Sequence, residues 1–206
     1  MSVHPLDIAL QTACPTVMVP MYGELAPFEK TGHRLLSARD GLWLEVRRPW
    51  MHLIWPIAQT DFPMPYGQVE KKVELAFGKI PMELITRFAT DAKAALPNEF
   101  GAWLIWDDQA KELRYRAMRS IAAGPAHLEA QRPDLEEHES FAVNLHSHAR
   151  IQAHFSTEDN NDDRNEVKIS GVIGSLHTDQ PTAVFRICTG GKFINLDVQN
   201  LLPSLG

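Results

Sequence analysis

The stretch that most constrains the fold reads SFAVNLHSH, from Ser140 to His148. Its apolar residues recur at every second position, which is the period of a β-strand with one buried face. On the opposite face, the same period places His146 and His148 side by side. We therefore expect a sheet that carries two neighbouring histidines on one surface.

This histidine pair, followed closely by Ser156 and Asp159, predicts a metal site. Imidazole is a preferred zinc ligand, and the carboxylate of Asp159 would add a third. Three protein ligands leave the fourth tetrahedral position to water, as in catalytic zinc sites. The bound ion lowers the pKa of that water from about 16 to about 7, so it supplies hydroxide at neutral pH.

A simpler interpretation uses the same residues. His146 and His148 would then be ordinary polar residues of an exposed strand face. Ser156 and Asp159 would be the N-cap and the third-position acid of a helix that begins TEDNNDDRNE. The two interpretations are compatible, because a capped helix would hold the hydroxyl and the carboxylate towards one pocket.

The spacing of these residues resembles the motif of the JAMM, or MPN+, zinc metalloproteases, which include the prokaryotic JAB proteins. The motif reads HxH, seven residues, S, two residues, D. It is matched at every fixed position by His146, His148, Ser156 and Asp159. The resemblance implies that both histidines and Asp159 bind Zn²⁺, and that Ser156 donates a hydrogen bond to the developing oxyanion.

Members of this family also carry a glutamate upstream, in bacteria typically in a P-x-E-x-x-G-type segment. The stretch LPNEFGAWLIW places Glu99 close to that context, although its glycine, Gly101, falls one residue early. Hydrolysis needs such a group, since the attacking water loses a proton and the leaving amine gains one. A second departure is Ala149, where many members have proline, and it predicts another path for the loop towards Ser156.

The rest of the second part predicts a helix followed by strands. PMELITRFATDAKAAL has helical spacing, with Pro81 in the first turn and Leu96-Pro97 at the end. The predicted strands are GAWLIW, ELRYRAMRS, SFAVNLHSH, KISGVIGSL, TAVFRIC and KFINL. The predicted fold class is α/β, with a mixed sheet flanked by helices, and the resemblance implies an MPN/JAB-type, cytidine-deaminase-like domain.

A small β-rich unit precedes this part, over about Gly32 to Ile57, with a hairpin turn at Asp40-Gly41. The proline-containing segment from about Ala58 to Gln68 is the predicted linker. We therefore expect a β-rich unit with its linker at residues 1–68 and the JAB-like domain at 69–206. Substrate docking, dimerisation and extension of the core all remain open as roles of the first unit.

Composition excludes several classes of partner. A net charge of −6 disfavours nucleic acid. No apolar run approaches the roughly 18 residues of a membrane span, and no secretory signal opens the chain. With only Cys14 and Cys188, neither a disulfide framework nor a thiolate zinc site is expected, so we predict a cytoplasmic protein of unspecified oligomeric state.

The stretches GHRLLSARDGLWLEVRRPW, VELAFGKIP and EVKISGVIG further resemble a bacterial, often plasmid-borne group in this family, the PRTRC system A proteins. That resemblance implies a peptidase or isopeptidase that processes or deconjugates a ubiquitin-like protein, with E1-like and E2-like partners from the same gene neighbourhood. Two alternatives stay open. One is a noncatalytic scaffold, and the other is a peptidase that releases a small amino acid from a sulfur-carrier protein.

Other residues with reactive or charged side chains receive structural interpretations. We expect His154 to be a solvent-facing loop residue and Asp162 and Asp163 to lie on a solvated helix face. Cys188 is expected to be buried packing and no nucleophile. Trp43, Trp50 and Trp55 are expected to form the core of the first unit.

Overall fold

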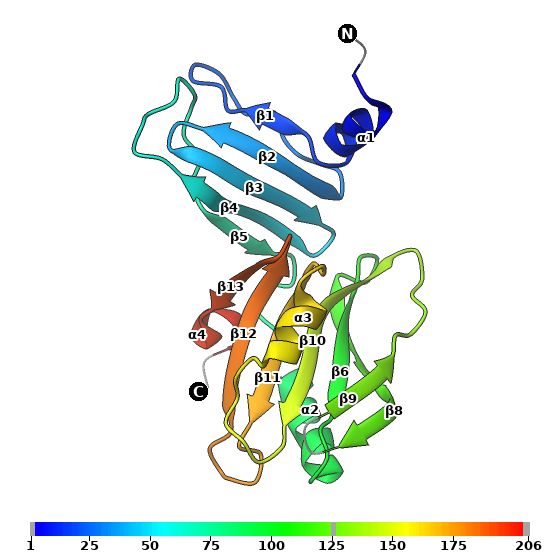
Figure 1. Ribbon diagram of the computed structural model, residues 1–206. Coiled ribbons are helices and arrows are strands. Elements are labelled where there is room, and N and C mark those ends of the chain that lie inside the picture. Colours follow the sequence, from blue (N-terminus) through cyan, green and yellow to red (C-terminus); the bar gives the residue numbers. More distant parts are fainter. Residues whose placement is uncertain (1–2, 125–126, 204–206) are drawn as a thin grey trace. The chain divides into compact units, whose positions relative to one another are not determined.

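The computed structural model describes residues 3–124 and 127–203. The chain divides into two compact units, Met1–Ala76 and Phe77–Gly206 (Figure 1). Both units are built mainly from β-sheet, and most helical residues belong to the second. Each unit has its own buried core.

The first unit is a five-stranded sheet preceded by helix α1 (Pro5–Ala13). In spatial order its strands are β1 (Thr16–Met18), β2 (Gly32–Ala38), β3 (Gly41–Arg48), β4 (Met51–Gln59) and β5 (Lys72–Leu75). The predicted hairpin at Asp40-Gly41 is confirmed. Gly41 has a φ of 138°, and a Cβ there would collide with the carbonyl oxygen of Ala58, so the turn requires glycine.

The core of the first unit is largely aromatic and aliphatic, as predicted. Trp43 and Trp50 are buried, whereas Trp55 is half-buried with the ammonium of Lys71 over its ring. A buried ion pair joins β2 to β3, since Nε of Arg34 donates to Oε2 of Glu45 at 2.6 Å. The sequence did not predict this ion pair.

The segment predicted to be the linker lies inside the first unit. Strand β5 pairs antiparallel with β4, so the residues from about Ala58 to Gln68 form a connection between two neighbouring strands of one sheet. Within that connection, the backbone N–H of Gly67 donates to the carbonyl of Val19. The division between the units falls after Ala76 instead.

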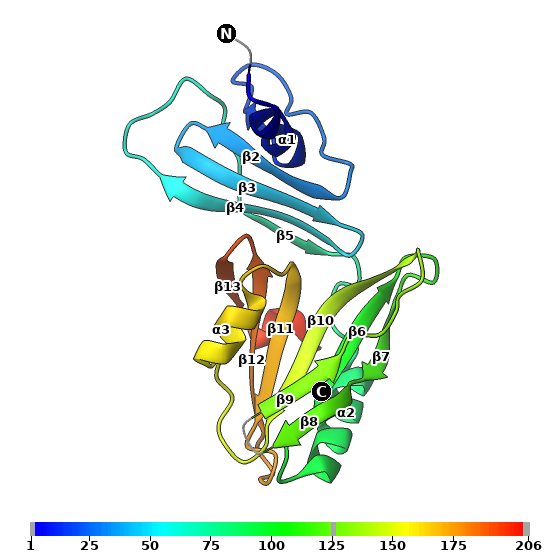
Figure 2. The ribbon, with the colours of Figure 1, turned by 45° about the vertical axis from the view of Figure 1, so that its right-hand side comes forward.

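The second unit contains a mixed six-stranded sheet with the order β13-β12-β11-β10-β6-β7. These strands are β6 (Gly101–Asp107), β7 (Glu112–Ala117), β10 (Glu139–His148), β11 (Lys168–Gly174), β12 (Thr182–Thr189) and β13 (Lys192–Leu196). Only the β10–β11 pair is parallel. A separate hairpin of β8 (Arg119–Gly124) and β9 (His127–Gln131) accompanies the sheet (Figure 2). The predicted α/β class with a mixed sheet is confirmed.

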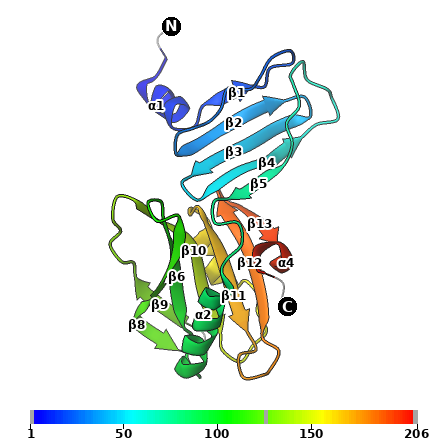
Figure 3. The same ribbon diagram turned by 180° about the vertical axis from the view of Figure 1, so that it is seen from behind.

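In the described part of the second unit, three helices accompany the sheet: α2 (Met82–Ala95), α3 (Thr157–Asp163) and α4 (Val198–Leu201). Figures 1 and 3 show α2 and α3 on opposite faces of the sheet. Helix α2 begins after Pro81 and ends at Leu96, as predicted, and it buries Phe88 and Ala92. None of the helices in the described ranges combines the length and apolar character that a membrane crossing needs.

The register of the central strands determines which residues share the α3 face. Trp103 of β6 lies opposite Asn144 of β10, and Gly101 lies opposite His146. On the other side of β10, Ser170 of β11 lies beside Asn144. Because side chains alternate along each strand, this face collects polar groups from three strands, while the residues between them enter the apolar core.

Candidate metal centre

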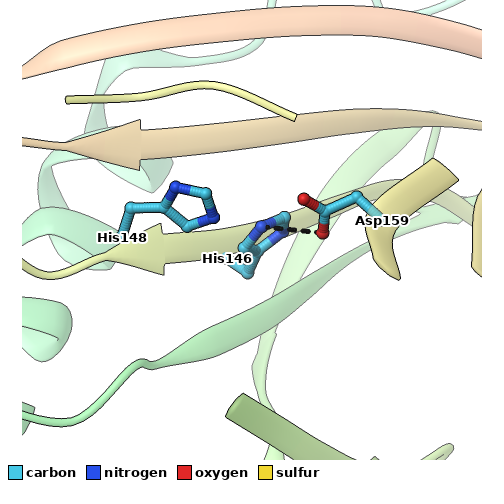
Figure 4. Close-up of side chains that lie close together, drawn as sticks. All are labelled: His146, His148 and Asp159. Atoms are coloured by element: carbon cyan, nitrogen blue, oxygen red, sulfur yellow. Dashed lines mark ion pairs between the residues drawn. The ribbon is translucent and has the colours of Figure 1, made fainter. Parts of the chain in front are cut away.

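His146 and His148 lie on the face of β10 that α3 covers. His148 is buried with 6% exposure, and His146 is half-buried. Their ring centroids are 5.2 Å apart. Asp159, on the first turn of α3, brings its carboxylate to the same place (Figure 4). Each of the three residues offers one ligand atom, and these atoms all lie within 4.8 Å of one another.

The position of Asp159 is set by a capping box at the start of α3. The Ser156 hydroxyl oxygen accepts from the backbone N–H of Asp159 at 3.1 Å, while the backbone N–H of Ser156 donates to Oδ2 of Asp159 at 2.6 Å. The Ser156 hydroxyl also donates to Oδ2 at 2.7 Å. The predicted helix cap is therefore confirmed.

The two carboxylate oxygens of Asp159 thus have different tasks. Oδ2 accepts two hydrogen bonds from Ser156, which fixes the rotation of the side chain. Oδ1 is turned to Nε2 of His146, 3.1 Å away. A cation bound by this carboxylate would therefore be held through Oδ1 alone.

The ionisation states of these residues suit a cation. Burial raises the pKa of Asp159, but the nearby His146 and the hydrogen bonds from Ser156 outweigh it, so its pKa is lowered from the usual value. Burial, followed by the charges of His146 and His154, lowers the pKa of His148 to about 4. At neutral pH the site therefore presents a carboxylate and a neutral imidazole at His148, as zinc requires.

An orphaned buried atom supports a metal at this place. Nε2 of His146 is buried and is without a hydrogen bond among the described residues, and the group nearest to it at the site is Oδ1 of Asp159, an ion-pair partner at 3.1 Å. An unsatisfied buried nitrogen costs about 1–3 kcal/mol, which a cation coordinated there would recover. Two imidazoles and one carboxylate are a usual donor set for catalytic zinc, so the residues fit this ion.

The three residues open into a cavity of about 900 Å³. The other predicted site residues, Glu99 and Ser156, line the same cavity, as does His154. His154 is an exposed loop residue, as predicted, and its Nδ1 lies 3.3 Å from Nδ1 of His148. All five residues predicted for the site are thus brought to one place in the second unit.

Glu99 is held beside the histidines through its chain neighbour. The backbone N–H of Phe100 donates to the hydroxyl of Ser147 at 2.9 Å, and the backbone N–H of Ser147 donates to the carbonyl of Phe100 at 2.8 Å. Ser147 lies between the two histidines in the chain. This reciprocal pair of bonds therefore ties the segment that carries Glu99 to the strand that carries the histidines.

The loop between His148 and Ser156 is held by the residues that directly follow β11 and by Thr182 at the start of β12, whose hydroxyl accepts from the backbone N–H of Ala153. The backbone N–H of Ser175 donates to the carbonyl of Ile151, and that of Leu176 donates to the carbonyl of Ala149. Ala149 has a φ of 35°. Proline cannot adopt this value, because its ring fixes φ near −65°. The observed path of the loop is therefore compatible with alanine at position 149 and incompatible with proline.

A buried group of charged residues beneath α3 was not predicted. Asp163 is 3% exposed and forms ion pairs with Lys168 and Arg186, so its expected place on a solvated face is wrong, whereas Asp162 is exposed. The sequence contains one indication of this group: Lys168 and Arg186 are the single charged residues of two largely apolar strands, KISGVIG and TAVFRIC. Such a cation in a buried strand needs a buried anion as its partner.

Cys188 joins this buried group and is no nucleophile, as predicted. It is fully buried, and its thiol donates to Oδ2 of Asp163 at 3.4 Å. Burial first, and then the charge of Asp163, raise the pKa of the thiol to about 12. The reactive thiolate is therefore not formed at neutral pH.

Comparisons with known proteins find a matching family model in each unit. The family described as a domain of unknown function, DUF2016, matches residues 4–76. The family described as prokaryotic homologs of the JAB domain matches residues 81–188, which include all the residues of the site. No curated protein matches the chain.

Among solved structures, the chain is similar to the solution structure of protein DSY2949 from Desulfitobacterium hafniense. The two share 14% sequence identity with a TM-score of 0.45, over 58% of this chain and 89% of that one. The identification of the family depends on the sequence match to the second unit, which spans more than half of the chain. On that match, this protein belongs to the prokaryotic homologs of the JAB domain.

Proposed function

We propose that the protein is a zinc-dependent metallopeptidase or isopeptidase that hydrolyses an amide bond at or near the C-terminus of a ubiquitin-like protein. One observation carries the proposal. The ligand atoms of His146, His148 and Asp159 lie within 4.8 Å of one another, in a cavity that Glu99 and Ser156 also line. A ligand set with an acid–base residue beside it is what amide hydrolysis requires.

The reaction divides between the ion and the protein. Zinc supplies Lewis acidity, which polarises the amide carbonyl and makes an attacking water more acidic. Glu99 accepts a proton from that water as the new C–O bond forms, and it donates a proton to the amine as the C–N bond breaks. His146, His148 and Asp159 hold the ion, and the lowered pKa values of His148 and Asp159 keep those two ligands in the required protonation states.

Ser156 contributes in two ways. In the structure its hydroxyl proton is directed to Oδ2 of Asp159, so its resting task is to orient that ligand. To bind the developing oxyanion, the hydroxyl has to rotate away from the carboxylate, while the bond from the Ser156 backbone N–H keeps Asp159 in place. The Ser156 hydroxyl can therefore bind the oxyanion while Asp159 keeps its orientation.

The choice of a ubiquitin-like substrate rests on the family and on the resemblance to PRTRC system A proteins. Membership of the JAB family supports a hydrolase with this ligand set. E1-like and E2-like proteins encoded nearby are the partners that the same resemblance implies. Deconjugation and precursor processing use the same bond chemistry, and the mass of the released product distinguishes them. A sulfur-carrier substrate would release a small amino acid instead of a protein.

The first experiment is elemental analysis of the purified protein. We expect about one zinc per chain in the wild type and none in the double variant His146→Ala, His148→Ala. His177→Ala is the matched control, because His177 is an exposed histidine that does not line the cavity. If the wild type neither contained zinc nor bound added zinc, the noncatalytic scaffold would replace this proposal.

The second experiment tests hydrolysis directly. Zinc-loaded protein is incubated with ubiquitin-like precursors and conjugates from its own gene neighbourhood, and the products are identified by mass spectrometry. We expect cleavage by the wild type and by His177→Ala, and none by the double histidine variant. Zinc binding without cleavage of any of these substrates would contradict the proposed substrate class.

A further inference from the structure

Arg186 contacts the residue before Ser156 and the residue after Asp159. Its guanidinium carbon lies 3.8 Å from the ring centroid of Phe155, which immediately precedes Ser156. Its Nη1 donates at 2.5 Å to Oδ1 of Asn160, which immediately follows Asp159. One arginine side chain therefore contacts both neighbours of the capping box in α3.

The same guanidinium also holds the far end of the helix. Nε and Nη2 of Arg186 both donate to Oδ2 of Asp163, at 3.2 and 2.6 Å. Its other flat face lies against Phe193 of β13, with 4.0 Å between the guanidinium carbon and the ring centroid. A planar group bonded along its edge and covered on both faces has little freedom to move.

The anchoring of Asp163 is completed by two further residues. Nζ of Lys168 lies 2.8 Å from Oδ1 of Asp163, and the thiol of Cys188 donates to Oδ2. Both cations and the carboxylate are at most 4% exposed. Removing one partner from such a buried group leaves an uncompensated charge, so the arrangement tolerates little adjustment.

These contacts matter because α3 is short and most of its residues are not buried. It spans only Thr157–Asp163, and Asp163 is its single buried residue. The arginine comes from β12, where it lies beside Ser170 of β11 on the α3 face. The contacts of Arg186 thus fix the helix relative to the sheet. The sheet carries the two histidines, and the helix carries Asp159.

We propose that Arg186 is a positioning residue of the metal centre, which holds α3 so that Oδ1 of Asp159 stays within coordinating distance of His146 and His148. The inference rests on the proposed zinc site and names a residue that does not touch the ion. Residues that orient metal ligands typically change metal affinity by about 10- to 100-fold when they are replaced. Arg186 acts in this way through its contacts with Phe155, Asn160 and Asp163.

The test measures zinc affinity by competition with a chelator, using the full-length chain. Arg186→Lys keeps the charge but loses the planar fork, and Arg186→Met also removes the charge. We expect about 10- to 100-fold weaker zinc binding in both variants. The matched controls are Arg34→Lys and Arg34→Met, which disturb the buried ion pair of the first unit and should leave zinc affinity at the wild-type level.

A spectroscopic measurement separates positioning from a general loss of stability. Cobalt(II) takes the place of zinc, and its visible absorption bands report the geometry of the ligands. We expect altered bands in Arg186→Lys and unchanged bands in Arg34→Lys. Asn160→Ala removes one contact and leaves the buried ion pairs intact, so it provides a folded variant with an expected loss of affinity of about 3- to 10-fold.

Two outcomes would overturn the inference, and they can be told apart. If the wild type binds zinc and the Arg186 and Asn160 variants match its affinity and cobalt spectrum, Arg186 has no positioning role although the metal centre stands. If the wild type binds neither zinc nor cobalt, the metal centre itself fails and the inference fails with it. Weaker binding confined to the Arg186 and Asn160 variants supports it.

Discussion

Oδ1 of Asp159 lies 3.1 Å from Nε2 of His146, although the two residues belong to a helix and a strand that are separated by a loop. The approach depends on the capping box, on the hydrogen bonds of the loop and on Arg186. It is therefore a product of the tertiary structure, and each of these supports can be tested separately.

Glu99→Gln should strongly reduce turnover while zinc stays bound. The amide keeps the size of the carboxylate but cannot accept the proton of the attacking water, so we expect kcat to fall by about 10²- to 10⁴-fold. Glu158→Gln is the matched control, because Glu158 is an exposed glutamate that lines the same cavity. Steady-state kinetics with zinc analysis checks both variants, and full activity in Glu99→Gln would exclude its proposed role.

Ser156→Ala should affect both the helix and the reaction. Loss of an N-cap hydroxyl costs about 1 kcal/mol, and Oδ2 of Asp159 loses one of its two donors. Ser156→Thr keeps a hydroxyl and should retain most of the stability. Urea unfolding combined with kinetics distinguishes the two tasks. If the alanine variant lost stability and kept its kcat, Ser156 would be a cap with no part in binding the oxyanion.

The stability of the metal-free protein should fall between about pH 6.5 and pH 4. The pKa of His148 is lowered from 6.5 to about 4 on folding, so in this window the unfolded chain binds a proton that the folded protein does not. The contribution is complete above pH 6.5 and is lost as the pH falls to 4, by about 3 kcal/mol. The lowered pKa of Asp159 acts in the same direction, but below its unfolded value of 3.8.

Thermal unfolding as a function of pH checks this prediction. His148→Gln removes the titrating group, so its stability should vary less with pH in this window than that of the wild type. Zinc-loaded protein should lose its metal on acidification, because the histidines must be neutral to bind it. Parallel pH profiles for the wild type and His148→Gln would contradict the assignment.

Gly174→Ala should disturb the metal centre from outside it. Gly174 lies beside His148 in the sheet, and a Cβ there would collide with the backbone of Ile151 and Ala153 in the loop that leads to Ser156. Displacing that loop should cost about 1–3 kcal/mol and weaken zinc binding. Gly23→Ala is the control, since its Cβ would come no nearer than 3.8 Å to Pro20. Urea unfolding and chelator competition measure the two effects.

The sequence was most informative where the physics is local. Alternation identified β10, and the spacing of Pro81 and Leu96 identified α2, because burial of one face and the restrictions of proline act within a few residues. The cap at Ser156 was likewise visible from the residue types alone. Gly101, which departs from the family pattern, turns out to lie opposite His146.

The features that escaped prediction depend on contacts between distant segments. Asp163 looked like part of an acidic surface, and only the fold shows that Lys168 and Arg186 meet it. In the same way, the segment after Ala58 reads as a linker until β5 is seen to pair with β4. Long-range pairing of this kind leaves little trace in the composition of either segment.

The two parts of the site are held by different kinds of contact: the bonds between Phe100 and Ser147 attach the segment of Glu99 to β10, whereas α3 is attached through Arg186 and Asp163. The two histidines lie on β10, and Glu99 lies two residues before β6, which pairs with β10 through backbone hydrogen bonds. Asp159 lies on a helix that is anchored through side chains. Opening of the site should therefore require the contacts of Arg186 to break before α3 can move. Amide protons of α3 should exchange with solvent before those of β10, because side-chain contacts hold the helix whereas backbone hydrogen bonds hold the strand.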